Sequence, residues 1–102
     1  MKLTVKERIV FASLFPKNYN LVEGTLIKDI KKKVEMTQEE LKDYEVKSLG
    51  NQITWNADKT KEKDIVFTDM EIDFLKERIK ELDKEKKLSD DNIDLAQKIN
   101  KI

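Results

Sequence analysis

Apolar residues recur at spacings of three and four over most of the chain, a pattern typical of amphipathic helices with one buried face. Four helix starts are marked by a Thr or Asn followed three residues later by Glu. In this capping box the side chains and backbone amides at the start of the helix bond reciprocally. The pairs are Thr4 with Glu7, Asn20 with Glu23, Thr37 with Glu40 and Thr68 with Glu71. Ser89, followed by Asp90 and Asp91, predicts the start of a fifth helix.

Each of the longer helices has an apolar face that we expect to be buried. The first helix should end before Pro16, and the third, a short one, near Tyr44. The apolar seam of the longest helix stops at Lys86 after two heptads, which is too short for a coiled coil, so this helix should lie on the domain. The faces comprise Val5, Ile9, Phe11, Ala12 and Leu14; Leu26, Ile27, Ile30 and Val34; Ile72, Leu75, Ile79 and Leu82; and Leu95, Ala96, Ile99 and Ile102.

The period changes between residues 45 and 56, where the pattern favours a β-hairpin. Gly50-Asn51 offers a turn, and the β-branched and aromatic run 53–55 follows it. Residues 57–63 form a polar loop, and residues 64–67 are a candidate third strand. The sequence therefore predicts an α+β fold with a winged-helix-like layout. Three N-terminal helices precede the hairpin and its candidate third strand, and a long and a short helix end the chain.

The chain of 102 residues fits one domain, residues 1–102, with a winged-helix-like core at 1–67 and a helical extension at 68–102 packed on it. Its 21 basic and 21 acidic residues give a net charge of zero, so no sign bias points to a disordered charged tail. There is no cysteine, which fits a reducing compartment. We expect a cytoplasmic protein, since the chain shows neither a signal peptide nor a membrane-spanning stretch.

The residue types give little support to catalysis. The chain has no histidine and no cysteine, so nucleophilic pairs built on either are impossible. Gly24 and Gly50 are isolated, and neither begins a phosphate-binding loop. Asp90, Asn92 and Asp94 alternate like the first ligands of a calcium loop, but the required glycine and glutamate are missing. We therefore predict no catalytic, cofactor-binding or metal-binding residue, and expect most acids to lie on solvated helix faces.

Two groups of lysines are candidate contacts to nucleic acid or to an acidic partner. Their ordinary explanation is that lysines complement the negative end of a helix dipole and guard strand edges. The functional alternative is a phosphate-contacting surface, because three helices and a hairpin are the order of a winged helix-turn-helix. Against it, residues 37–44 in the recognition position hold three acids and one lysine. The groups are Lys28, Lys31 and Lys32, and Lys59, Lys61 and Lys63.

Three apolar residues are candidate interface positions. Trp55 is either a binding anchor or, as is usual for a lone tryptophan, part of the core. Phe74 stands off the seam of the long helix, so it is expected at the surface, where Met70 or Ile102 would extend it into a patch. Such a patch would let the long helix pair with its copy in a homodimer.

Several segments together are similar to those of small proteins of unknown function encoded by phages and prophages of bacteria. The segments are 3–9, Pro16, 37–40, 53–56, and Leu82-Asp83 with 86–88. The resemblance implies a bacterial cytoplasmic setting and an accessory role in a mobile element, and it carries over no catalytic or binding residue.

The sequence leads to three hypotheses. The first is a non-enzymatic phage or prophage accessory protein that acts by contacts with another protein, with a homodimer as one form. The second is a winged-helix transcriptional regulator that binds DNA through the lysines, which zero net charge disfavours. The third is a minimal enzyme that uses converging carboxylates and a divalent metal.

Overall fold

Four capping boxes start four helices at the predicted residues. A computed structural model describes all of residues 1–102. In each box the side chain of the Thr or Asn accepts a hydrogen bond from the backbone N–H of the glutamate three residues later. The side chain of that glutamate accepts one from the backbone N–H of the Thr or Asn. Thr68 Oγ1, for example, accepts the Glu71 N–H at 3.2 Å, and Glu71 Oε1 accepts the Thr68 N–H at 2.8 Å. Local chemistry therefore fixes where α1, α2, α3 and α4 begin.

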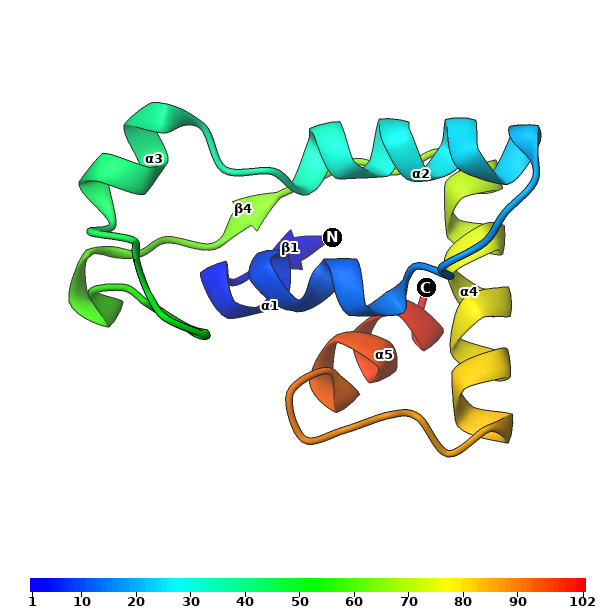
Figure 1. Cartoon of the computed structure of the whole chain (residues 1–102). Helices are drawn as coiled ribbons and strands as arrows, with labels where there is room; N and C mark the ends of the chain where they lie inside the picture. Colours follow the sequence, from blue (N-terminus) through cyan, green and yellow to red (C-terminus); the bar gives the residue numbers. More distant parts are fainter.

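The chain confirms the predicted α+β class, with five α-helices, two 3₁₀ helices and four short strands (Figure 1). The elements in chain order are β1 Lys2–Leu3, α1 Val5–Val10, η1 Phe11–Leu14, α2 Leu21–Val34, α3 Gln38–Asp43, β2 Lys47–Leu49, β3 Gln52–Thr54, η2 Ala57–Lys59, β4 Lys63–Asp64, α4 Asp69–Lys84 and α5 Ile93–Asn100.

The first helix turns into a 3₁₀ helix, and this changes which of its apolar residues are buried. Phe11 and Leu14 are fully buried, whereas Ile9 is half-buried and Ala12 is exposed. Side chains three apart stand above one another in a 3₁₀ helix, so η1 keeps Phe11 and Leu14 on the core side. The prediction that Ala12 belongs to the buried face was wrong for that reason, whereas Ile9, on α1, is half-buried.

The last helix begins later than Ser89 predicts. α5 starts after Asn92, and the buried Asn92 side chain accepts the Ser89 N–H at 2.8 Å. Ser89 thus opens a turn that leads into the helix, and its hydroxyl caps nothing. The apolar face of α5 is confirmed at Leu95 and its neighbours, except that Ile102 lies beyond the helix and is half exposed.

The hairpin forms as predicted, but it stands apart from the other strands. β2 pairs with β3 around Gly50, whose φ of +61° suits glycine in this tight turn. The third strand lies at 63–64 instead of 64–67, and it pairs with β1, an element too short for the pattern to predict. The two pairs are separate two-stranded sheets. The winged-helix layout is not confirmed, because the hairpin does not join a sheet with the third strand.

The hydrophobic core draws on both ends of the chain. In Figure 1, α1 lies between α2 and α5, and α4 runs along one side of all three. Residues 1–67 and 68–102 contribute to a single cluster of buried side chains, so the C-terminal helices share the core with the N-terminal part. Its members are Leu3, Phe11, Leu14, Ile30, Val34, Ile65, Phe67, Leu75, Ile79, Leu82, Leu95, Ala96 and Ile99.

Residues 35–64, hereafter the arm, contribute nothing to that core. The stretch carries α3, the hairpin, η2 and β4, and none of its residues is buried. None of them packs as a partly buried residue against the core cluster either. Figure 1 shows α3 and the green hairpin segment at the end of the molecule away from α4. Apolar packing against the core therefore does not hold the arm in place.

Truncation of one leucine in the core and of one in the arm should show how differently the two regions contribute to the free energy of unfolding. Leu75 is fully buried, so Leu75→Ala should lower the free energy of unfolding by about 2–5 kcal/mol. Leu49 on the hairpin is 64% exposed, and Leu49→Ala should change it by less than about 0.5 kcal/mol. Urea denaturation measures both values. A loss at Leu49 as large as that at Leu75 would place the hairpin in the core.

Candidate functional site

A buried arginine of α1 closes the C-terminal end of α2. Arg8 is only 4% exposed, and its guanidinium donates from Nε to the Val34 carbonyl and from Nη2 to the Glu35 carbonyl, both at 2.9 Å. The last carbonyls of a helix lack partners within it and carry partial negative charge. A cation placed there satisfies them and draws α1 and α2 together.

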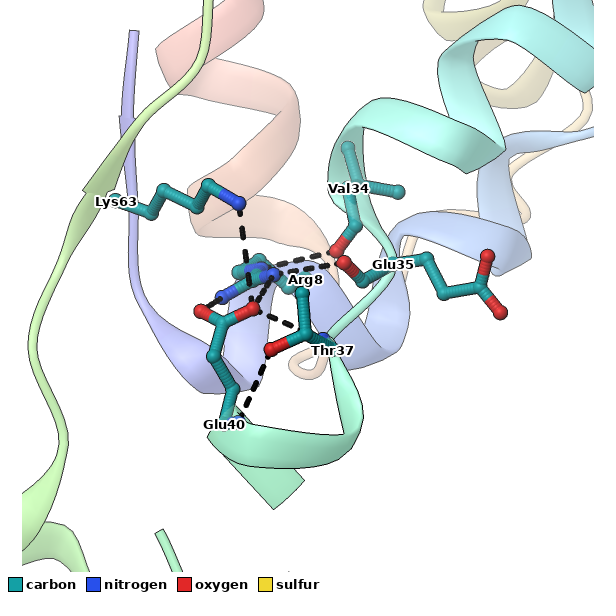
Figure 2. Close-up of polar contacts among 6 residues, drawn as sticks. All are labelled: Arg8, Val34, Glu35, Thr37, Glu40 and Lys63. Atoms are coloured by element: carbon teal, nitrogen blue, oxygen red, sulfur yellow. Dashed lines mark hydrogen bonds and ion pairs between the residues drawn. The ribbon is translucent and has the colours of Figure 1, made fainter. Parts of the chain in front are cut away.

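The same guanidinium holds the arm. Nη1 donates to Glu40 Oε2 at 2.7 Å and Nη2 donates to Glu40 Oε1 at 3.1 Å (Figure 2). This bidentate pair orients the guanidinium and the carboxylate relative to each other. Glu40 also accepts the Thr37 N–H at 3.0 Å as the glutamate of the α3 capping box. Lys63 Nζ on β4 lies 4.0 Å from Glu40 Oε1. We call Arg8, Glu40 and the carbonyls of Val34 and Glu35 the Arg8 clasp.

The clasp changes the acidity of its carboxylate. Hydrogen bonds from Arg8 lower the pKa of Glu40 to about 2, and they outweigh partial burial, which acts in the opposite direction. The backbone bond from Thr37 and the positive charge of Lys63 add to the lowering. Glu40 is therefore ionised over the whole physiological range, and its charge serves to attach the arm.

Two other capping-box glutamates pair with lysines from distant helices. Glu7 Oε1 lies 2.7 Å from Lys98 Nζ of α5, and Glu71 Oε1 lies 2.5 Å from Lys33 Nζ of α2. Burial raises the pKa of both carboxyls, yet the lysine and capping hydrogen bonds leave the pKa below the ordinary value. Both acids are buried, so the expectation that acids lie on solvated faces was wrong for them.

Within the arm, polar contacts join α3 to the segment after the hairpin. Glu45 accepts from Lys59 Nζ at 2.7 Å and from Asn56 Nδ2 at 3.2 Å. The Asn56 N–H donates to the Tyr44 carbonyl at 2.9 Å. Glu45 has a φ of 54°, which turns the chain from α3 into the hairpin. The arm thus has its own internal order.

The six candidate lysines differ in whether they form ion pairs. Lys28, Lys31 and Lys32 are exposed on α2 without an ion pair, and Lys31 stands 5.7 Å from the centre of the Phe15 ring. In the loop group, Lys59 is bound to Glu45 and Lys63 faces Glu40, which leaves Lys61 exposed and unpaired. The two groups therefore differ: α2 presents free charge, and the loop lysines mainly organise the arm.

The three candidate interface residues occupy different environments. Trp55 is half-buried in the arm outside the core. Phe74 packs against the core cluster and is half-buried, so the expectation of an exposed Phe was wrong, since the side of α4 beside its seam also meets the core. Met70 is 63% exposed and lines a small hollow between α2 and α4 with Leu26 and Lys33. They form no single patch with Ile102, which lies at another hollow.

A large apolar hollow lies where β4 leads into α4. Its walls come from both ends of the chain, so no pattern along the sequence predicts it. Its volume is about 580 Å³, which is the size of a ligand pocket. We call it the β4 groove. It is lined by Met1, Lys2, Glu62, Ile65, Val66, Phe67, Ile72, Lys98, Lys101 and Ile102.

Comparison with protein-family models, with curated proteins and with solved structures finds no match. The resemblance to phage proteins accordingly stays a prediction. None of the helices combines the length and the apolar character that a membrane crossing requires. No three acidic side chains converge where they could hold a metal ion. The hypothesis of a metal-assisted carboxylate enzyme stays a prediction.

The clasp predicts a pH-dependent loss of stability. Glu40→Gln should lower the free energy of unfolding by about 3 kcal/mol at pH 7, the lower end for removing one partner of a buried pair, since Glu40 keeps 19% of its side chain exposed. The folded pKa is below the ordinary 4.5, so the ionised carboxylate stabilises the fold above that value and its contribution falls toward about pH 2.

Urea denaturation of wild type and Glu40→Gln at pH 7 and about pH 3 measures this contribution. The difference between the two proteins should shrink at the lower pH, while the contributions of Glu7 and Glu71 are common to both and cancel. A difference that is unchanged by pH would mean that the charge of Glu40 does not hold the arm.

Proposed function

We propose that the chain is a non-enzymatic protein that binds another protein through the arm. One observation carries the proposal: thirty consecutive residues, 35–64, are held in a defined conformation without a single buried side chain. Because no side chain of this ordered segment is buried in the core of its own molecule, its surface is available for contact with a partner. The accessory role in a bacterial cytoplasm, which the phage resemblance implies, is consistent with this activity.

The surface chemistry of the arm supports protein contact. Leu49 and Ile53 are 64% and 46% exposed on the two hairpin strands, and Trp55 follows them half-buried. Tryptophan is enriched among the residues that dominate binding energy at interfaces. The hairpin is also a separate two-stranded sheet, so each strand has an open edge. A partner therefore finds apolar side chains and free backbone groups together.

Replacing the exposed apolar residues of the hairpin should remove partner binding and leave the fold intact. In a pull-down from a lysate of the organism that makes this protein, the tagged wild type should recover a partner protein that the Leu49→Ser/Ile53→Ser double variant does not recover. The melting temperature of the double variant should be unchanged. Leu21→Ser is the matched control, because Leu21 is 87% exposed on α2 outside the arm. Mass spectrometry of the recovered proteins reads the result. Equal recovery by the double variant would disprove binding through the hairpin.

DNA binding is the second candidate function, and the three unpaired lysines of α2 are the observation that favours it. Zero net charge and the exposed acids Glu39 and Asp43 on α3 oppose it, because the DNA backbone is negatively charged. We expect gel-shift assays at low salt to show no complex. Binding that falls steeply with salt and disappears in a Lys28→Glu/Lys31→Glu/Lys32→Glu variant would replace protein binding as the function.

A further inference from the structure

The outer edge of β4 is an open sheet edge that runs directly into the β4 groove. The Ile65 N–H donates to the Met1 carbonyl at 2.8 Å, and the Ile65 carbonyl accepts from the Met1 ammonium at 2.9 Å, so both groups of Ile65 face the chain at β1. Neighbouring residues of an extended strand direct these groups to opposite sides, and Val66 therefore directs its own away from β1. Neither group of Val66 forms a hydrogen bond within the protein.

The opposite edge of the same sheet is covered. Lys98 Nζ donates to the Lys2 carbonyl on β1 at 2.8 Å and is held there by Glu7. A side chain that occupies the edge blocks pairing with another strand, which is how many proteins protect such edges. On the β4 side no such cover lies at Val66, two residues beyond β4, which is 80% exposed. Of the two edges of this sheet, only that of β4 remains available.

The groove beside this edge combines an apolar floor with a mainly basic rim. Ile65 and Phe67 are buried below it, and Ile102 is half exposed at its side. The charged residues that line it are Lys2, Lys98, Lys101 and Glu62. Lys2 and Lys101 are exposed and have no ion pair, whereas Lys98 is bound to Glu7. The charge of the rim therefore favours an occupant with acidic groups at its ends.

We propose that the β4 groove binds an extended peptide segment that has aliphatic residues at alternate positions and acidic residues at its ends. The segment adds a strand at Val66 through main-chain hydrogen bonds, a recurrent mode of peptide recognition. Its aliphatic side chains cover Val66 and Ile102, and its acidic ends face Lys2 and Lys101. This site goes beyond binding by the hairpin, and of the arm only Glu62 lies at its rim.

Titration with the acetylated, amidated peptide Glu-Val-Thr-Val-Thr-Val-Glu tests the proposal on the full chain by ¹⁵N NMR. The peptide should shift the amides around Val66 and slow hydrogen exchange of the Val66 amide at least about tenfold, because a new main-chain bond forms there. The analogue with Lys in place of both Glu residues should bind about tenfold more weakly or not at all. Absence of binding, equal binding of both peptides or an unprotected Val66 amide would each overturn the proposal.

Protein variants locate the site. Lys101→Glu should weaken the acidic peptide about tenfold, and Lys84→Glu, an exposed change at the end of α4 outside the groove, should not. Leu49→Ser/Ile53→Ser should bind the peptide like wild type, which separates this site from the hairpin. Dodecanoate serves as a competing probe. If it binds the groove and the peptide does not, the groove accepts single-chain amphiphiles and the proposal is wrong.

Discussion

One buried guanidinium attaches the start of the arm, whose far end is β4, paired with β1. Arg8 joins three pieces of chain: its own helix, the end of α2 and the start of α3. A buried charge is costly unless every donor finds a partner, and the two carbonyls with the Glu40 carboxylate meet that need. The hydrophobic core organises the rest of the molecule, but it ends at Val34 and resumes at Ile65. Between those residues, polar geometry determines the position of the chain.

Three glutamates of the capping boxes form both local and long-range contacts. Glu7, Glu40 and Glu71 each satisfy a backbone amide at the start of a helix and also bind a cation from another element. One carboxylate thus fixes both where a helix begins and which neighbour it approaches. Because both duties require the ionised form, these acids serve structure, and none of them is free for proton transfer.

The sequence was informative where chemistry is local. Capping residues predicted four helix starts, and the spacing of Leu75, Ile79 and Leu82 predicted the buried face of α4. What it did not predict depends on distant partners: the pairing of Leu3 with Lys63 and the walls of the β4 groove. Arg8 did leave a signal, because it stands three residues from Val5 and from Phe11 on the buried side of the first helix. A cation on an apolar face requires partners, but only the fold identifies Val34, Glu35 and Glu40.

Native-state hydrogen exchange tests most directly whether the arm is attached by the clasp and not by the core. We expect the arm amides of Val46 and Asn56, which donate to the Leu41 and Tyr44 carbonyls, to exchange through an opening of lower free energy than the amides of α4. That opening should depend little on denaturant, because it exposes little apolar surface. If arm and α4 amides instead show the same free energy and the same denaturant dependence, the arm unfolds together with the core and is not attached separately by the clasp.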